Sequence, residues 1–163
     1  MKRIACLMLI VSLLLTGCGF LGERIHEPVL FYYLCQNYQK ELCCVIVSEE
    51  REVTGHSGDI PYLLALYELG PAGTDYRSPL PSGTQIDAEL RNGKLQLELS
   101  EKAIALSDSE FSLACACLTM TFLDVGEIES VTLCCGERKK TMTRDSLSLY
   151  DTAEIISPTE EYK

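Results

Sequence analysis

The chain has 163 residues, 47% of them hydrophobic, and carries 24 acidic against 14 basic side chains. This length fits one domain with a substantial core, and this apolar fraction excludes wholesale disorder. A net charge of −10 opposes binding to nucleic acid and to anionic lipid headgroups, because both carry negative charge.

The N-terminus is organised like a bacterial lipoprotein signal. Lys2 and Arg3 give a positive start, and residues 4–15 are uncharged and mostly apolar. This run is shorter than the roughly 18 residues that a membrane-spanning helix needs. Small residues then precede Cys18, as in the lipobox, where signal peptidase cuts before a cysteine that receives a diacylglyceryl thioether. We expect residues 1–17 to be a signal peptide and Cys18 to be the lipidation site.

Lipidation at Cys18 places the protein on the extracytoplasmic face of the cell membrane. Two acyl chains of the palmitate type give stable anchoring, whereas one gives marginal binding. Residues 18–27 are then a lipidated tether. Loss of Lys2 and Arg3 leaves 12 of the 14 basic side chains against 24 acidic ones, so the mature chain is more acidic still. The expected membrane contact is the lipid, and no nucleic acid partner is expected.

The first elements of the domain are two strands and a helix. β-branched and aromatic residues predict strands over 29–34 and 42–53. Ser57 or Asp59 can cap a helix that Gly70 and Pro71 end. Its apolar residues recur at helical spacing: Ile60, Leu63, Leu64 and Tyr67.

A β-hairpin follows a loop rich in glycine, proline and serine. Asn92 and Gly93 are the preferred pair for a two-residue type I′ turn, and Arg91 then lies opposite Lys94. This register gives one apolar face, with the pairs Ile86–Leu99, Ala88–Leu97 and Leu90–Leu95. The other face is polar and acidic, and we take it as the candidate interaction face: Asp87, Glu89, Gln96 and Glu98.

The remaining elements are a second helix and a strand. Ser107, Asp108 or Ser109 can cap the helix, whose buried stripe consists of Phe111, Ala114, Cys115, Leu118 and Phe122. Gly126 ends it. A strand over 130–135 follows, and Gly136 opens a turn into the basic residues 138–140. The order β-β-α-β-β-α-β predicts an α+β domain over residues 28–150: a small mixed sheet of about five strands with two helices on one face. Residues 151–163 are predicted to be a flexible tail.

Cysteine is unusually frequent. With Cys6 in the signal and Cys18 lipidated, seven remain: Cys35, Cys43, Cys44, Cys115, Cys117, Cys134 and Cys135. An odd number cannot pair fully within one chain. Adjacent cysteines on a strand point to opposite faces, and the Cys-x-x-Cys spacing of structural zinc sites is absent from the sequence. Apolar neighbours favour buried thiols, with one or two disulfides as the alternative; no metal is expected.

Candidate catalytic residues are few. His26 lies in the tether, and a triad of Ser57, His56 and Asp59 would need near neighbours in sequence to assemble. These residues suit a turn and a helix cap better. The acidic pairs Glu49–Glu50 and Asp108/Glu110 are more typical of solvated surface than of a glycosidase site. A phosphate-binding glycine loop is also absent from the sequence. We predict a non-enzymatic protein without a cofactor.

The domain resembles the GerMN domain, named for a sporulation and spore-germination lipoprotein. The resemblance spans roughly residues 28–145. The resembling segments are residues 31–34, 67–71, 78–84, 92–93, 97–100, 121–122 and 131–136. It implies one copy of an extracytoplasmic module related to the ring-building modules of sporulation complexes, which work by association. It implies no catalytic residues.

Two functions follow from these observations. The first is a scaffold or interaction lipoprotein that associates with itself or with an envelope protein, in sporulation, germination or envelope assembly. The second is a lipoprotein that binds a small ligand or the cell wall through the loop 70–84, where Tyr76 and Arg77 could shape a groove. An exposed edge strand favours the first function, and a deep apolar pocket the second.

Overall fold

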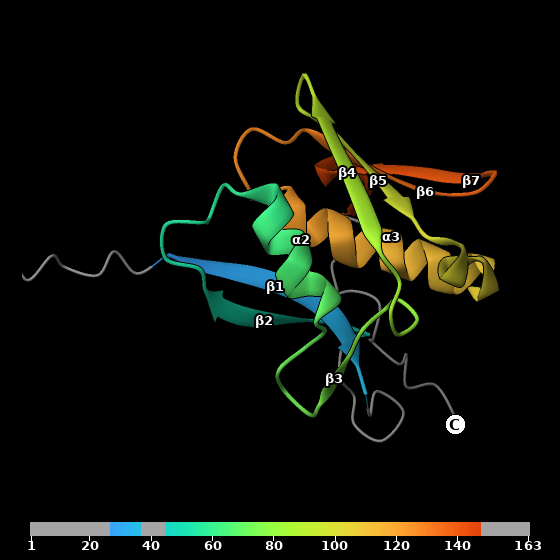
Figure 1. The fold of residues 1–163 in the computed structure, drawn as a ribbon, viewed down its shortest axis with the longest axis horizontal. Helices are drawn as coiled ribbons and strands as arrows, with labels where there is room; N and C mark the ends of the chain where they lie inside the picture. Colours follow the sequence, from blue (N-terminus) through green and yellow to red (C-terminus); the bar gives the residue numbers. More distant parts are fainter. Residues whose placement is uncertain (1–26, 37–44, 148–163) are drawn as a thin grey trace, which may run out of the picture.

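The computed structural model describes residues 27–36 and 45–147 (Figure 1). The predicted signal peptide, Cys18, most of the tether, residues 42–44 and the tail 151–163 lie outside them. The elements in chain order are β1 (Pro28–Cys35), β2 (Ile46–Glu52), α2 (Ile60–Glu68), β3 (Tyr76–Arg77), β4 (Ile86–Arg91), β5 (Lys94–Leu99), the 3-10 helix η2 (Glu101–Ala105), α3 (Asp108–Phe122), β6 (Ser130–Cys135), β7 (Arg138–Thr143) and α4 (Arg144–Leu147). Within the described ranges, no helix is long and apolar enough to cross a membrane.

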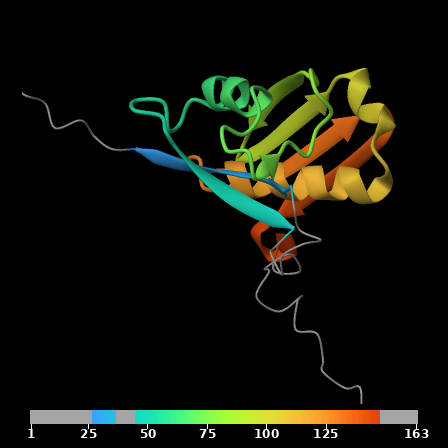
Figure 2. The same cartoon turned by 90° about the horizontal axis from the view of Figure 1, so that it is seen from below.

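The strands form two sheets. The first has the order β2-β1-β3, and the second has the order β4-β5-β6-β7 with β5 and β6 parallel. Helix α3 contacts β1 of the first sheet and both β6 and β7 of the second, so it runs between the sheets (Figures 1 and 2). The α+β class predicted from the sequence is confirmed.

Helix α3 is buried around most of its circumference. Its buried residues are Phe111, Ala114, Cys115, Ala116, Cys117, Leu118, Thr119, Thr121 and Phe122. The predicted stripe is therefore correct but too narrow, because β1 covers a second side of the helix. Ser107 is the N-cap, and its side chain and that of Glu110 each bond the other residue's backbone N–H in a capping box.

Helix α2 begins and ends where the sequence predicts. The Asp59 carboxylate accepts the backbone N–H of Tyr62 at 3.2 Å, and Pro61 lies in the first turn. Gly70 has a φ of +80°, the left-handed conformation that favours glycine after a helix. Leu63, Leu64 and Tyr67 face the core.

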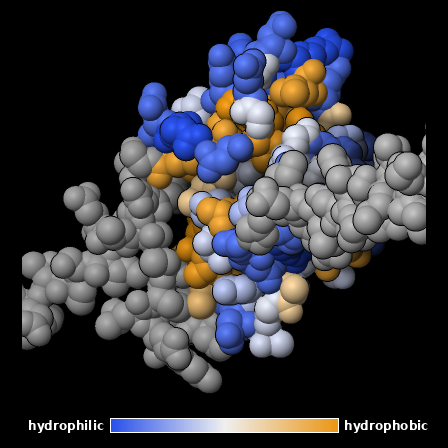
Figure 3. All heavy atoms as spheres, turned by 90° about the vertical axis from the view of Figure 1, so that its left-hand side faces the viewer, coloured by the Kyte–Doolittle hydropathy of each residue, from blue (hydrophilic) through white to orange (hydrophobic). Residues whose placement is uncertain are grey.

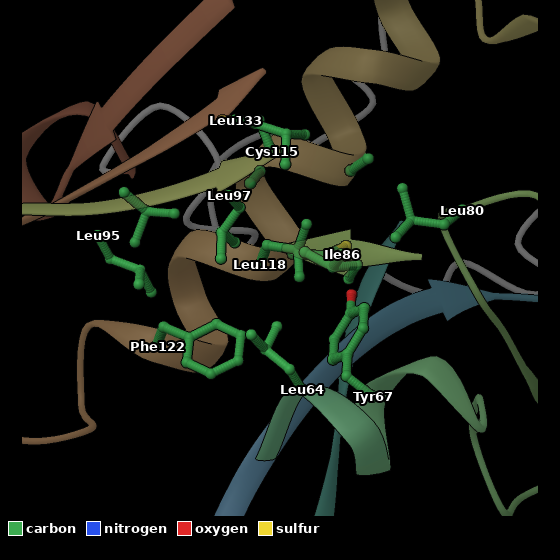
Figure 4. Close-up of a cluster of buried hydrophobic side chains, with 14 of the residues drawn as sticks. Leu64, Tyr67, Leu80, Ile86, Leu95, Leu97, Cys115, Leu118, Phe122 and Leu133 are labelled. Atoms are coloured by element: carbon green, nitrogen blue, oxygen red, sulfur yellow. The ribbon is translucent and has the colours of Figure 1, made fainter. Parts of the chain in front are cut away.

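The β4–β5 hairpin has the predicted register, from Arg91 opposite Lys94 to Ile86 opposite Leu99. Asn92 and Gly93 have φ values of +50° and +72°, as a type I′ turn requires. Figure 4 shows Leu95 and Leu97 of β5 in the core. They lie there with Leu64 of α2 and with Leu118 and Phe122 of α3.

The expected single sheet of about five strands is instead two sheets with seven strands in the described residues. Strand β3 has only two residues, too few to give a periodic signal. Strand β7 was not predicted, because the basic residues 138–140 that follow the turn at Gly136 show no alternation of apolar and polar side chains. The helices are not layered on one sheet face either, since α3 is covered by both sheets.

Candidate interaction surface

The four predicted interaction residues lie side by side on one face of the hairpin. Asp87 is opposite Glu98, and Glu89 is opposite Gln96, with all four side chains exposed. The alternate residues of β5 turn the other way and are buried in the core, where α3 covers the sheet. The sequence pattern therefore placed this surface correctly.

Strands β6 and β7 continue this face with smaller polar side chains. Thr132 lies next to Gln96, and its hydroxyl is 2.8 Å from that of Thr141. Glu98 lies next to Cys134, which is opposite Lys139. Burial raises the pKa of the Cys134 thiol, and the Glu98 carboxylate raises it further, which disfavours a thiolate there.

The face also has a positive end at the hairpin turn. Arg91 and Lys94 are opposite each other and exposed, and Arg91 forms an ion pair with Glu89. Negative charge thus concentrates at Asp87 and Glu98, two residue pairs beyond the Glu89–Gln96 pair. We call the exposed residues Asp87, Glu89, Gln96 and Glu98 the acidic face.

The basic stretch 138–140 does not form one surface patch. Successive strand residues point to opposite sides of the sheet. The Arg138 guanidinium lies 4.8 Å from the centre of the Phe111 ring and donates to the carbonyl oxygen of Leu106 at 2.6 Å. Lys140 donates to the Ser112 hydroxyl at 2.8 Å.

The loop 70–84 borders a pocket of about 300 Å³ at the end of α2. Its lining residues are Tyr67, Glu68, Leu69, Gly70, Ser78, Leu80, Pro81, Ser82, Gly83 and Thr84. Tyr76 and Arg77 are not among them. They form β3 and pair with Cys35 and Leu34 at the end of β1. This pocket is therefore lined by other residues of the same loop than the two named from the sequence.

Glu49, considered above as a catalytic carboxylate, holds the loop instead. Its carboxylate accepts the backbone N–H of Gly73 at 2.8 Å and pairs with the Arg51 guanidinium at 2.7 Å. Arg51 also donates to the carbonyl oxygens of Leu66 and Gly70, at 3.1 and 2.5 Å. Burial alone would raise the pKa of Glu49, but these hydrogen bonds and the positive charge of Arg51 lower it. This network was not predictable from the sequence, because Glu49 and Arg51 bind backbone groups that lie 15 to 24 residues later in the chain.

The Tyr33 hydroxyl is the buried side-chain oxygen that lacks a hydrogen-bond partner in the described part of the chain. Burial raises the pKa of Tyr33 to about 12, although the Arg51 guanidinium opposes the shift. Its ring stacks on Tyr67, with centroids 5.1 Å apart. Tyr33 is therefore neutral at physiological pH and is poorly suited to proton transfer.

His56, Ser57 and Asp59 do not assemble as a triad. His56 Nδ1 is 3.2 Å from the Asp59 carboxylate, but the Ser57 hydroxyl donates to Glu27 at 3.1 Å. The His56 ring stacks on Tyr62 with centroids 4.2 Å apart. Glu110 is likewise committed, because the backbone and side chain of Ser107 donate to its carboxylate and lower its pKa.

Cys115, Cys117, Cys134 and Cys135 are buried free thiols, which confirms the buried-thiol prediction for these four. Cys35 is half-buried, and Cys43 and Cys44 lie outside the described residues. Across the described ranges, no three His, Cys, Asp or Glu side chains are grouped to hold a metal ion.

Two residues of the hairpin are exposed although the pattern assigned them to the core. Ala88 and Leu90 lie on the same side of the sheet as Leu95 and Leu97, yet Leu90 is 49% exposed. The outer end of β4 reaches past the helices (Figure 1). The alternation of residues along a strand predicts which face of the sheet each side chain lies on. It does not predict how far along the strand a helix covers that face.

The geometry defines an α+β module in which a buried helix runs between two sheets and one sheet face is polar. The first GerMN domain of the sporulation protein GerM from Bacillus subtilis is similar, with a TM-score of 0.50 at 14% identity over 69% of this chain and 85% of that one. The tandem GerMN domains of the same protein match with the same score and identity over 40% of their chain. A Clostridium perfringens chain assigned as a lipoprotein gives a TM-score of 0.47 at 16% identity over 72% of this chain and 87% of that one.

The chain therefore has a GerMN-like fold, as its sequence suggested. No protein-family model and no curated protein matches the sequence. At 14% identity the likeness concerns the fold alone.

Proposed function

We propose that this chain is a lipid-anchored extracytoplasmic protein whose domain binds another protein of the cell envelope and performs no catalysis. The observation that carries the proposal is the acidic face, whose four exposed side chains lie in register on β4 and β5. Such a face supplies charge complementarity, which selects partners and speeds their encounter. The GerMN-like fold supports a setting in sporulation, germination or envelope assembly.

The anchor is proposed from the sequence around Cys18. Cys18→Ala removes the thiol that would be acylated, and the protein should then leave the membrane fraction. Fractionation of cells that express each form, with detergent-free washing, measures this. A Cys6→Ala variant is the matched control, since that cysteine lies within the predicted signal. Membrane retention of the Cys18→Ala form at the wild-type level would overturn the anchor.

A partner of the acidic face should present basic side chains. Crosslinking of the full chain in cells, followed by identification of the crosslinked protein, tests for it. The double variant Glu89→Lys with Glu98→Lys should reduce crosslinking at least about tenfold, because like charges then oppose each other. Glu127→Lys, at an exposed position outside the acidic face, is the control and should crosslink as wild type does.

We propose the absence of catalysis because the candidate catalytic side chains are hydrogen-bonded or ion-paired to other groups of the domain. Glu49 is bonded to Arg51 and to the loop, and Ser57 is bonded to Glu27. Hydrolase assays on purified cell-wall material should show no turnover above the buffer blank. Turnover that disappears in Glu49→Gln or in His56→Ala would contradict the proposal.

The pocket favours a second candidate, binding of a small polar ligand from the cell wall. Its volume of about 300 Å³ is at the lower end for ligand sites, and hydroxyl side chains contribute to its lining. Soluble wall fragments should then shift the NMR signals of Ser82 and Thr84. Unchanged signals at saturating fragment concentrations would remove this candidate.

A further inference from the structure

Strand β4 is an edge of the four-stranded sheet, because its hydrogen-bonded strand neighbour is β5 alone. The pair Arg91–Lys94 flanks the two-residue turn and is a hydrogen-bonded pair, so the next residue inward is not. By this alternation, the backbone groups of Leu90, Ala88 and Ile86 point away from β5, toward the outer edge.

One contact confirms this direction and limits the available edge. The backbone N–H of Ile86 donates to the Glu68 carboxylate of α2 at 2.7 Å. Ile86 is buried, whereas Ala88 and Leu90 are exposed. Within residues 27–36 and 45–147, no hydrogen bond reaches the outward backbone groups of Ala88 and Leu90. The open part of the edge is therefore the outer end of β4.

The side chains on this open edge differ between its two sides. Ala88 and Leu90 present apolar surface on the side of the core, and Asp87 and Glu89 present carboxylates on the acidic face. Figure 3, with the hairpin turn uppermost, shows hydrophobic surface bordered by hydrophilic side chains in this region. Proline and bulges, which commonly protect an edge strand, are absent from β4 itself, residues 86–91, whose charged side chains are Asp87, Glu89 and Arg91.

We propose that the outer edge of β4 binds an extended segment of another protein by strand addition, with basic residues opposite Asp87 and Glu89 and apolar residues beside Ala88 and Leu90. The inference rests on the proposed function and specifies its binding mode. The backbone groups of Ala88 and Leu90 form the hydrogen bonds with the added strand. The alternation of apolar and basic residues in that strand makes the binding selective.

A basic strand complements this edge better than a second copy of β4 does. Two antiparallel β4 strands centred on Glu89 place the two Glu89 carboxylates opposite each other with Asp87 opposite Arg91, and centring on Ala88 places Asp87 opposite Glu89. Like charges directly opposite destabilise a strand pair. A basic strand from a different protein removes this repulsion and gains attraction instead.

A synthetic peptide of alternating valine and lysine tests the edge directly on the purified full chain. Binding is measured by fluorescence anisotropy, and hydrogen exchange reports individual amides. The amides of Ala88 and Leu90 should become protected in the presence of the peptide. The same peptide with alternate backbone nitrogens methylated, and a valine–glutamate peptide, are the controls and should bind at least about tenfold more weakly.

Two variants locate the binding. Ala88→Pro removes one outward N–H and no bond to β5, so the affinity for the valine–lysine peptide should fall about fivefold or more. Asp87→Lys with Glu89→Lys keeps the backbone and should reverse the preference toward the valine–glutamate peptide. Lys139→Glu, on the opposite edge strand of the same sheet, should leave the affinity unchanged.

The outcomes separate this inference from the proposed function. Absence of peptide binding, or binding that neither variant changes, overturns strand addition at β4. Crosslinking of the wild type to an envelope protein would still support the proposed function in that case. Crosslinking of β4 to β4 of another copy would replace the proposed partner by self-association. Absence of any crosslinked protein would instead contradict the proposed function.

Discussion

The hydroxyl of Thr121 in α3 accepts the backbone N–H of Tyr32 in β1 at 3.0 Å. It also donates to the Cys117 carbonyl oxygen at 2.9 Å, within its own helix. On the other side, the Tyr67 hydroxyl of α2 donates to the Tyr32 carbonyl oxygen at 2.9 Å. Both backbone polar groups of Tyr32 are therefore held by helices. The pairing of β1 with β3 is confined to Leu34 and Cys35, so at Tyr32 the two helices satisfy the backbone groups that no strand of the described residues reaches.

Replacement of Thr121 by valine should destabilise the domain by about 1–3 kcal/mol, because the half-buried Tyr32 N–H loses the acceptor that the buried Thr121 side chain supplies. Urea unfolding followed by circular dichroism measures the change in the free energy of unfolding. Thr121→Ser keeps the hydroxyl and is the matched control, with a smaller loss from its missing methyl group. Equal stability of the valine variant and the wild type would contradict the role assigned to this hydrogen bond.

Arg51 should be a second position where substitution is costly. Its guanidinium joins Glu49, Leu66 and Gly70 and lies 5.2 Å from the centre of the Phe31 ring, with 15% of its side chain accessible. Arg51→Met leaves a carboxylate and two carbonyl oxygens without this donor and should cost roughly 1.5–3 kcal/mol in the free energy of unfolding.

The matched control for Arg51 is Arg91→Met, which removes an exposed arginine that is also paired with a glutamate two residues away in sequence. Surface ion pairs contribute about 0–1 kcal/mol, so Arg91→Met should change the free energy of unfolding little. A comparable loss in both variants would mean that burial and the carbonyl contacts of Arg51 do not matter.

The lowered pKa of Glu49 makes stability depend on pH. The ordinary value of about 4.5 applies to the unfolded chain, and the folded value is lower. The unfolded chain therefore takes up the proton first as the pH falls. The stabilisation is fully present above about pH 4.5 and is lost as the pH falls through the folded pKa. The difference in free energy of unfolding between wild type and Glu49→Gln should accordingly shrink between pH 6 and pH 3. Glu127→Gln, at an exposed position, is the matched control.

The parts of the fold that could be predicted from the sequence depend on patterns among residues close together in the chain. The hairpin register followed from one turn, Asn92–Gly93, and from alternation along two adjacent strands. Asp59 and Ser107 are among the two or three candidates that the sequence predicts for each helix cap, because capping depends on residues within one turn. The acidic face of the candidate site was found for the same reason, as the polar half of the hairpin pattern.

Relationships between distant residues could not be predicted in this way. The division into two sheets depends on α3 lying between β1 and β6, and α3 has buried residues on more sides than one stripe. The inward turn of Arg138 depends on the Phe111 ring and on carbonyl groups about thirty residues earlier. The exposure of Leu90 depends on how far the hairpin reaches past the helices.

The buried thiols of α3 should be unreactive in the folded protein. Cys115 and Cys117 are 0% exposed, and burial raises the pKa of both thiols above the ordinary value of about 9. Only the thiolate attacks an alkylating reagent, so a raised pKa and exclusion of the reagent act in the same direction. Iodoacetamide at pH 8 should leave both cysteines unmodified in the native protein and modify both in urea. Peptide mass spectrometry after quenching measures each site separately, and the urea sample is the internal control for reagent and digestion. Modification of Cys117 in the native protein at the rate found in urea would show that α3 is not buried between the two sheets as described.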